Sequence, residues 1–470
     1  MNIGTIARPH GDTLDTAFPQ DGHRAPGPAN WPLVGQSLAF WMDPLNYTLK
    51  LQREYGDVAR YHVRGEPIYL LGHPDHVRHV FDRNSGNYRK SNFYDAVRPF
   101  FGNGLVLSEG DFWKRQRQTM QPAFHRDRIV EMAKVMQRGA QEFADSLHAT
   151  ARAGEPIDIV NPMMCSALNT ATRAMFGVDS DEVFERMRRA VPLLLRGAEQ
   201  RIWSVLPISY KIPLPANIRF NRALRDLDDV VWTIINDRRA TGRRADPGDL
   251  LDMLLEARDV DGNGLTDQQL RDEVLTIFVA GFETVANAIS FTLLLLAHHP
   301  EIQEKIRAEL DTVLNGDIPS YETVRSLPEL TNAFQEAMRV YPPIWTVSRA
   351  LVGDDEIGGY RIPAGSTVQI APYLLHRDPR WWEKPNRFWP DHFTKERADA
   401  RPRYAYMPFG GGPRVCLGRN FAMMEGPIVI GTLLQRYRIK PGSDEGLTEP
   451  EAMISLRPKK GAMLRLEPRT

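Results

Sequence analysis

The feature that most constrains this chain is a long apolar segment between residues 267 and 299. Thr266 precedes it, Gln269 follows three residues later, and Pro300 marks its end, a pattern typical of a capped helix. Such a helix is roughly 50 Å long at about 1.5 Å per residue. It is apolar nearly all round from Val274 to Leu296, and a helix of this kind is buried on every side. The fold must therefore be large enough to enclose it.

The segment does not indicate a membrane span. Its longest apolar stretches, such as Ile289–Ala297, are short and include Ser290 and Thr292, whereas a bilayer span needs about 20 apolar residues. The first residues lack the charged and apolar regions of a signal peptide. We therefore expect a cytoplasmic protein with no membrane span, in which residues 1–25 form a mobile N-terminal tail and residues 26–470 form a single domain.

Composition removes several classes of function. The 59 Lys and Arg residues balance the 59 Asp and Glu residues, so the chain lacks the basic excess of a nucleic-acid-binding protein. Two cysteines, Cys165 and Cys416, cannot form a disulfide framework or a four-thiolate zinc site. Each cysteine therefore has to be explained separately, and core packing explains Cys165.

The remaining periodicity predicts a mainly α fold with a smaller β-rich part contributed by both ends of the chain. The expected elements are a hairpin formed by Val58–His62 and Ile68–Leu71, a strand near Ser366–Ala371, a last hairpin within Met453–Leu466, a helix from Pro300 to about Asn315, and a helix from about Ser326, with Glu329 closing its capping box, to Tyr341.

The strongest chemical signal surrounds Cys416, where four glycines fall within the ten residues from Phe409 to Gly418. Glycines let the backbone approach a flat or bulky group closely. The apolar stretch Asn420–Leu434 predicts a helix, so Cys416 would lie at a helix N-terminus, which stabilises a thiolate. Such a thiolate can ligate a metal or act as a nucleophile, and an inert buried cysteine is the alternative.

Nucleotide binding is less well supported. No Gly-Lys-Ser/Thr sequence follows the glycines before Cys416, as a phosphate-binding loop requires. The short motif Gly102-Asn103-Gly104 lacks the third glycine of a dinucleotide fingerprint. Neither glycine-rich segment therefore predicts a nucleotide site.

A second signal interrupts the long helix at Ala280-Gly281-Phe282-Glu283-Thr284. Glycine costs about 1 kcal/mol there relative to alanine, and a buried acid and hydroxyl are costly unless they are hydrogen-bonded. A local distortion beside a cavity, with Glu283 and Thr284 handling protons, would account for all three residues. In the alternative, Thr284 bonds to the carbonyl four residues earlier and Glu283 reaches solvent. A third signal, Glu336 with Arg339, is alone an ordinary helix pair.

Taken together, these segments resemble the cytochrome P450 superfamily. The matching motifs occur in the family's order and are the haem-binding loop Phe409–Gly418 (F-G-x-G-x-R-x-C-x-G), the oxygen-activating segment 280–284, the E-x-x-R pair Glu336 and Arg339, and the W-x-x-x-R motif at Trp113 and Arg117. The resemblance covers the chain after about Pro26. It implies the cytochrome P450 fold, with haem b between the long central helix and the cysteine loop.

The resemblance also implies a role for each matching residue. Cys416 would ligate the haem iron, and the haem would be held by Trp113, Arg117, Arg349, Phe409, Arg414, Cys416 and Gly418. Glu283 and Thr284 would relay protons to dioxygen. Glu336 and Arg339 would form a buried structural pair, with His392 where many members have arginine. Val285 stands where a second hydroxyl is common.

The implied function is a monooxygenase that inserts one atom of dioxygen into a lipophilic molecule, a fatty acid or a terpenoid. Electrons would come from a separate ferredoxin- or flavodoxin-type protein, which could dock on a basic patch of Lys114, Arg115, Arg126, Arg128 and Arg419. Alternatives are a peroxide-dependent or rearranging haem-thiolate enzyme, and a haem sensor or non-catalytic helical binding protein. The expected substrate pocket comprises Phe93, Val97, Phe100, Leu105, Phe278, Ala280, Ile344, Trp345, Val347, Met453 and Ile454, and core packing is the alternative for each.

Overall fold

A computed structural model describes residues 24–29, 35–202, 204, 209–242, 249–258 and 262–469. Most of the expected N-terminal tail, residues 1–23, lies outside this part. Ala25 is already buried, and the carbonyl of Pro26 accepts a hydrogen bond from the Arg60 amide at 2.7 Å. The chain is therefore attached to the folded body from about Ala25 onward.

Helices hold 59% of the residues, so the expected mainly α class is confirmed. The α-helices are Ser37–Met42 (α1), Pro44–Tyr55 (α2), Pro74–Arg78 (α3), Arg98–Phe101 (α4), Gly110–Met120 (α5), Arg126–Ser146 (α6), His148–Ala153 (α7), Val160–Phe176 (α8), Asp181–Ile202 (α9), Pro215–Thr241 (α10), Leu250–Glu256 (α11), Asp267–His298 (α12), Pro300–Leu314 (α13), Pro328–Val340 (α14), Pro372–Leu375 (α15), Lys395–Ala400 (α16) and Arg419–Arg436 (α17). Shorter helical turns are His79–Arg83 (η1), Ser85–Asn87 (η2), Asn92–Ala96 (η3), Gln121–Phe124 (η4), Val324–Ser326 (η5), Pro390–Phe393 (η6) and Gly412–Arg414 (η7).

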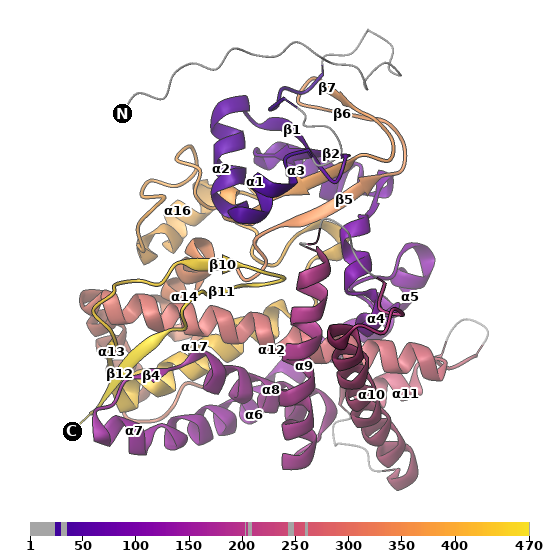
Figure 1. Ribbon diagram of the computed structural model, residues 1–470. Coiled ribbons are helices and arrows are strands. Elements are labelled where there is room, and N and C mark those ends of the chain that lie inside the picture. Colours follow the sequence, from indigo (N-terminus) through magenta and orange to yellow (C-terminus); the bar gives the residue numbers. More distant parts are fainter. Residues whose placement is uncertain are drawn as a thin grey trace.

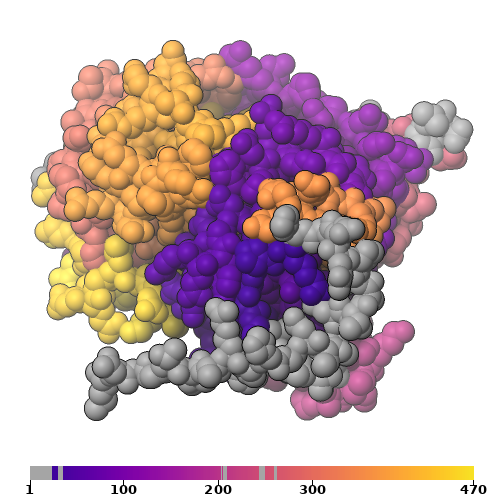
Figure 2. Space-filling model, turned by 90° about the horizontal axis from the view of Figure 1, so that it is seen from above, coloured from indigo at the N-terminus to yellow at the C-terminus, as the bar shows by residue number. Residues whose placement is uncertain are grey.

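The strands form a smaller part, and the main sheet joins two distant segments of the chain. The strands are Val58–Val63 (β1), Glu66–Leu71 (β2), Tyr88–Lys90 (β3), Ile157–Asp158 (β4), Val347–Leu351 (β5), Asp355–Ile357 (β6), Tyr360–Ile362 (β7), Thr367–Ile370 (β8), Tyr437–Pro441 (β9), Pro450–Ala452 (β10), Leu456–Pro458 (β11) and Met463–Pro468 (β12). The main sheet has the order β1-β2-β8-β5-β3, and the others are β4-β12-β9, β10-β11 and β6-β7. Seen from above, the N-terminal segment and the orange segment that includes β6 and β7 share one face (Figure 2).

The long helix α12 runs through the middle of the helical part and contacts α8, α14 and α17 (Figure 1). Its capping box of Thr266 and Gln269 is confirmed, because each side chain accepts the other residue's backbone N–H. The helix is long and apolar enough to cross a membrane, but 83% of its most apolar 18-residue stretch is buried inside the protein. Burial against neighbouring helices accounts for its apolar composition.

Two expected elements differ in the structure. The last hairpin is not formed within Met453–Leu466: β10 pairs with β11 around Met453–Ser455, while β12 pairs with β9 and β4. Helix α14 begins at Pro328 without a capping box from Ser326 and Glu329. Instead, the Glu309 carboxylate of α13 accepts the backbone N–H groups of Glu329 and Leu330 at 2.9 and 3.1 Å. In both cases a partner distant in sequence replaces the local one.

Candidate active site

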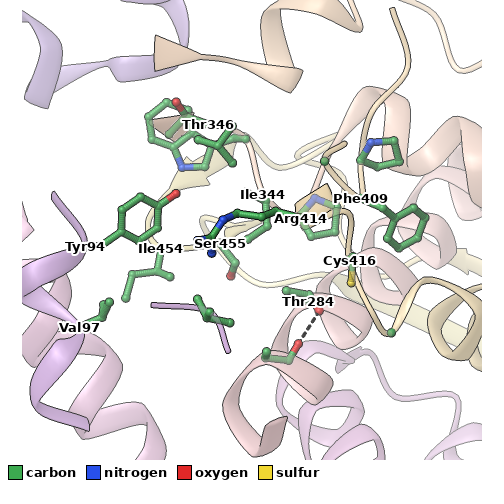
Figure 3. Close-up of a pocket in the computed structure, with 18 of the residues that line it drawn as sticks. Tyr94, Val97, Thr284, Ile344, Thr346, Phe409, Arg414, Cys416, Ile454 and Ser455 are labelled. Atoms are coloured by element: carbon green, nitrogen blue, oxygen red, sulfur yellow. Dashed lines mark hydrogen bonds between the residues drawn. The ribbon is translucent and has the colours of Figure 1, made fainter. Parts of the chain in front are cut away.

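A cavity of about 500 Å³ lies between α12 and the loop that carries Cys416. This volume is within the range of about 300–1,000 Å³ that is usual for small-molecule sites. In the close-up view, Thr284 lies near the Cys416 sulfur with its hydroxyl turned to the Ala280 carbonyl, and Tyr94, Val97 and Ile454 lie farther from the sulfur (Figure 3). Side chains from the main sheet, from α5 and from the β10–β11 turn complete the lining.

The Cys416 sulfur is reached from this cavity. Its side chain has accessible surface, yet protein surrounds it so closely that burial raises the pKa of its thiol. Both observations hold because the accessible surface belongs to the cavity. The Gly418 N–H bonded to the sulfur, together with the guanidinium groups of Arg117 and Arg419, lowers the same pKa in part. Helix α17 starts at Arg419, so the expected position of Cys416 at a helix N-terminus is confirmed.

The glycines before Cys416 are required by close packing. Gly412 has φ +63°, and a Cβ atom there would lie 2.2 Å from the carbonyl oxygen of Phe81. The Cys416 N–H donates to the Phe409 carbonyl at 2.9 Å, which closes the loop. This tight loop is what brings the sulfur to the cavity wall.

On the opposite wall, α12 presents its smallest residues. Ala280 is exposed and Gly281 and Thr284 are half-buried, although most neighbouring residues of the helix are buried. The expected local distortion is wrong, since α12 is α-helical throughout. The Thr284 hydroxyl donates to the Ala280 carbonyl at 3.0 Å, as in the alternative considered for this residue. Small side chains here leave the cavity room next to the helix.

Glu283 does not reach solvent. Its side chain is buried, and one carboxyl oxygen accepts a hydrogen bond from the Ser455 hydroxyl at 2.7 Å. Ser455 in turn accepts from the Asn287 amide at 3.0 Å. Burial raises the pKa of Glu283, and the Ser455 bond and Arg457 offset the rise in part. The carboxyl group therefore binds a proton more tightly than a glutamate in water.

A cluster of basic side chains lies at one rim of the cavity. Lys90 and Arg349 stand directly opposite each other on β3 and β5, where like charges repel. Arg414 is the third member, stacked over the Trp113 ring at 4.3 Å from its centre and paired with Glu109. Burial together with Arg349 and Arg414 holds the pKa of Lys90 well below its usual value. The two guanidinium groups exceed the one carboxylate in charge, and a further anion bound here would favour the charged form of Lys90.

The other residues expected to hold the cofactor also line the cavity. Arg117 donates to the Val415 carbonyl at 2.7 Å, which ties α5 to the cysteine loop. Phe409 and Gly418 line the cavity from that loop. Trp113, Arg117, Arg349, Phe409, Arg414, Cys416 and Gly418 are thus brought together around one space.

Glu336 and Arg339 are both completely buried away from the cavity lining, and they form a two-bond ion pair with N–O distances of 2.8 Å. Arg339 also donates to the carbonyls of His376, Pro385 and Arg387, each at 2.7 Å. His392 Nδ1 lies 3.2 Å from both Glu336 oxygens, and its Nε2 accepts the Lys384 N–H at 3.3 Å. This arrangement requires the hydrogen on Nδ1, so His392 donates to Glu336.

Most of the expected substrate residues line the cavity, and two do not. The lining includes Phe93, Val97, Leu105, Ala280, Ile344, Trp345, Val347, Met453 and Ile454. Phe100 and Phe278 lie outside it. Phe100 packs against Phe101 with ring centres 4.5 Å apart, and Phe278 packs against Phe176 at 4.3 Å. Ring packing in the core replaces the expected pocket role at these two positions.

Several residues of the site could not be predicted from the sequence. Lys90, Glu109 and Ser455 carry no motif, and tertiary contacts alone bring them to the site. A further carboxyl group, Glu199 of α9, is buried near Glu283, and burial raises its pKa to about 7. The sequence gives one indication of a role for Lys90, which is that it is a charged residue in the short strand that begins at Tyr88.

The family model for cytochrome P450 matches residues 25–465 of the chain. This protein belongs to the cytochrome P450 family. Curated P450 relatives from Streptomyces include cyclooctatin synthase of Streptomyces melanosporofaciens, 35% identical over 88% of this chain and 89% of the relative. Pentalenene oxygenase of Streptomyces avermitilis is 32% identical over 95% of this chain and 97% of the relative.

A solved P450 structure gives the same result for the fold. The retinoic acid-bound cyanobacterial CYP120A1 superposes with a TM-score of 0.85 at 25% identity, covering 96% of this chain and all of that one. The expected P450 fold is thereby confirmed. This P450 is an oxidoreductase of the monooxygenase type, which uses haem, dioxygen, a lipophilic substrate and a redox partner.

The residues of this P450 fit haem. The cavity-facing sulfur of Cys416 supplies a thiolate-type ligand. The excess positive charge of Lys90, Arg349 and Arg414 over Glu109 matches a group that carries two carboxylates. Ala280 and Gly281 leave space against α12 for a flat ring. Charge, shape and ligand type agree.

Proposed function

We propose that this P450 hydroxylates a lipophilic terpenoid in the cytoplasm, with haem b as cofactor and electrons from a ferredoxin- or flavodoxin-type protein. The observation that carries the proposal is the apolar cavity bounded by Cys416 on one wall and by Ala280 and Thr284 on the other. Terpenoid monooxygenases among the relatives, at 32–35% identity, support the substrate class.

In this proposal, Cys416 holds the haem iron, and the haem when bound supplies the centre at which dioxygen is activated. The Gly418 N–H and the Arg117 guanidinium stabilise negative charge on the sulfur, since both lower the pKa of the thiol. The haem carboxylates are bound by Lys90, Arg349 and Arg414. The Trp113 ring stacks against the Arg414 guanidinium and supports it. Together they fix the orientation of the ring in the cavity.

Glu283 and Thr284 supply protons in this proposal. Ser455 can both donate and accept, and it connects the Asn287 amide with the Glu283 carboxyl. The raised pKa of Glu283 keeps a proton available in a buried place. The Thr284 hydroxyl, now bonded to the Ala280 carbonyl, can rotate towards the cavity that it faces. A dioxygen-using enzyme needs such a proton supply, whereas a peroxide-dependent one does not.

The charges of the lining favour an uncharged terpenoid over a fatty acid. Within the described lining the cationic side chains are Lys90, Arg117, Arg349 and Arg414. Arg117 and Arg414 are bound to protein carbonyls or to Glu109, and Lys90 and Arg349 are assigned to the haem. The rest of the wall offers no cation for a substrate carboxylate, so burial of apolar surface drives binding.

The donor is proposed to dock on the side of the molecule where α5 meets the cysteine loop. Arg117 ties α5 to the Val415 carbonyl, and the exposed side chains of Lys114 and Arg115 lie on the same helix. Arg126, Arg128 and Arg419 are the other members of the proposed basic patch, and of these Arg126 and Arg419 are exposed and Arg128 is half-buried. Such a patch suits an acidic ferredoxin or flavodoxin, because local fields steer association even at zero net charge.

Carbon monoxide difference spectra of the reduced protein test the haem ligand. We expect the strongly red-shifted Soret band of thiolate ligation in the wild type and in Cys165→Ala, and its loss in Cys416→Ala. Cys165 is a matched control, because it is a half-buried cysteine outside the cavity lining. A red-shifted band that survives in Cys416→Ala would disprove the assigned ligand.

Substrate-induced spin-state spectra test the substrate class. We expect cyclic terpene hydrocarbons and alcohols to shift the haem to high spin at lower concentrations than fatty acids of similar size. Tighter binding of the fatty acids would overturn the terpenoid assignment. Product formed with peroxide as readily as with an electron donor and dioxygen would favour the peroxide-dependent alternative.

A further inference from the structure

A row of polar side chains occupies the N-terminal half of α12. Arg271, Asp272, Glu273 and Thr276 are all buried, in a helix whose other residues at this level are apolar. Buried polar groups are costly unless they are hydrogen-bonded. Their partners therefore indicate what these four side chains do.

The row is bonded to the backbone of residues 100–105, about 170 positions earlier in the sequence. Arg271 donates to the Phe100 carbonyl at 3.0 Å, and Thr276 lies 3.5 Å from the Phe101 carbonyl. Asp272 accepts the Asn103 N–H at 2.8 Å, and Glu273 accepts the Leu105 N–H at 3.0 Å. From α5, Gln116 donates to the Asn103 carbonyl at 3.3 Å. The backbone of this segment is thus held from α12 along its length.

This contact explains the motif Gly102-Asn103-Gly104. Gly102 has φ +58°, and a Cβ atom there would lie 2.1 Å from the Asp272 carboxyl group. A Cβ atom at position 104 would lie 2.2 Å from the Thr276 hydroxyl oxygen and 2.6 Å from the Asp272 carbonyl oxygen. Only glycine permits such an approach. The two glycines therefore allow the segment to lie directly on α12.

The segment held in this way forms part of the cavity wall. Val97, Phe101, Leu105 and Val106 line the cavity, and α4, which includes Phe101, lies against α12 (Figure 1). A change in the position of this segment would move four apolar side chains at once. Of the four side chains in the polar row, Thr276 itself lines the cavity and the other three do not. The row therefore sets the shape of the wall by holding the segment that forms it.

The charges in the row are compensated unequally. Arg271 pairs with Asp272 at 2.9 Å and with Asp228 of α10 at 2.6 Å, which connects the row to α10. Glu273 has no ion-pair partner among the described residues, and its Oε1 atom has no hydrogen-bond partner there. Burial and the neighbouring Asp272 raise its pKa to about 8. The uncharged form of Glu273 is therefore favoured, and its carboxyl group accepts the Leu105 N–H.

We propose that Arg271, Asp272, Glu273 and Thr276 form a backbone clamp that positions the wall segment 97–106 and thereby determines which substrates this P450 accepts. The inference rests on the proposed function, because it concerns the substrate pocket of that site. The clamp residues are positioning residues. Glu273 is the most informative position to substitute, because a single hydrogen bond, from the Leu105 N–H, connects it to the wall.

The test compares Glu273→Leu, Glu273→Gln and the control Glu425→Leu in the haem-loaded protein. Glu425 of α17 is also buried without a partner, and burial raises its pKa to about 8, but it does not line the cavity. The readout is the ligand concentration that gives half of the high-spin shift, for a compact bicyclic and a larger tricyclic terpene alcohol. The carbon monoxide spectrum and thermal unfolding of each variant are recorded beside it.

We expect the ratio of the two half-shift concentrations to change by about tenfold in Glu273→Leu, the size expected for losing one buried hydrogen bond. Glu273→Gln should keep the wild-type ratio, because its amide oxygen still accepts the Leu105 N–H. Glu425→Leu should also keep it, whatever its stability. An unchanged ratio in Glu273→Leu, or an equal change in Glu425→Leu, would overturn the proposal.

A second measurement covers the case in which Glu273→Leu does not fold. Hydrogen exchange should be at least tenfold faster than in the wild type at the Asn103 amide in Asp272→Ala and at the Leu105 amide in Glu273→Ala, and unchanged in Glu425→Gln. Unchanged exchange would overturn the clamp. If the wild type shifts spin with fatty acids and not with terpenes, the substrate class fails, and the ratio is then measured with a short and a long fatty acid.

Discussion

Two buried glutamates of this P450 are held in opposite ways. Glu336 accepts two bonds from Arg339, one from the Trp389 N–H and one from His392. Glu283 accepts one bond from the Ser455 hydroxyl, and burial raises its pKa. Hydrogen bonding on this scale lets Glu336 anchor structure together with Arg339. Sparse compensation favours the protonated form of Glu283, which is the form that a proton donor needs.

The largest effect should come from breaking the compensated site. Glu336→Gln leaves Arg339 as an unpaired charge at 0% exposure, so we expect a loss of about 3–5 kcal/mol in the free energy of unfolding and poor haem retention. Urea unfolding and the haem-to-protein absorbance ratio measure this, with the exposed Glu301→Gln as control. Wild-type stability of Glu336→Gln would contradict the structural role.

Glu283→Gln should leave the fold intact but impair the proposed chemistry. The amide can still accept the Ser455 bond, so stability should not fall, whereas it cannot donate a proton as a carboxylic acid does. We expect product formation to decrease by about 100-fold, with electrons diverted to peroxide. The measurements are the amounts of product and of hydrogen peroxide formed per electron donor oxidised. An unchanged ratio of product to donor oxidised would exclude Glu283 from the proton supply.

Glu425 extends the comparison to a carboxyl group without any hydrogen-bond partner among the described residues. Burial raises its pKa to about 8, so the folded state holds this proton more tightly than the unfolded chain. The stability that this proton contributes is complete below the pKa of the same glutamate in the unfolded chain, and it is lost as the pH rises through about 8. Glu425→Gln should reduce the fall in stability over this range by about 1 kcal/mol per pH unit.

Unfolding measured from pH 5 to pH 8 tests this slope. Glu336→Gln cannot serve as a control, because it is itself expected to destabilise the fold. Glu301→Gln is the control, and it should leave the slope unchanged because its side chain is exposed. The same slope in Glu425→Gln and in the wild type would show that Glu425 does not hold its proton in the folded state.

The smallest effect should come from Ser455→Ala, which removes one neutral donor at a cost of about 1 kcal/mol. The Ser455 bond lowers the pKa of Glu283, so its loss raises that pKa further. Activity that needs the protonated acid declines as the pH rises through this pKa, and the decline should move to higher pH. Turnover measured from pH 6 to pH 9 tests this, and a shift to lower pH would contradict it.

The parts of the fold that depend on local chemistry could be predicted from sequence. Thr266 and Gln269 cap α12 as expected, and the hairpin of β1 and β2 forms around Arg64-Gly65. The start of α14 could not be predicted, because its cap is Glu309 of another helix. For the same reason the pairing of β12 with β9 was missed.

The site shows the same division. The loop before Cys416 carries its information in consecutive residues, so the location of the sulfur at a helix start could be predicted. Lys90 and Ser455 reach the site only through the register of β3 on β5 and the turn between β10 and β11. Phe100 and Phe278 failed as pocket residues because an apolar ring does not indicate whether a cavity or another ring will lie beside it.

The opposed pair of Lys90 and Arg349 has a consequence for assembly. In the haem-free chain, burial and the facing Arg349 disfavour the charged form of Lys90 across the last strand pair of the main sheet, with Glu109 and Arg414 beside them. We expect β3 to pair weakly in that state and firmly once the haem carboxylates are present. Hydrogen exchange at the β3 amides with and without haem measures this, and equal protection would contradict it. The cofactor would then act as the counter-ion that completes a sheet edge, so that loading and folding of this edge are one event.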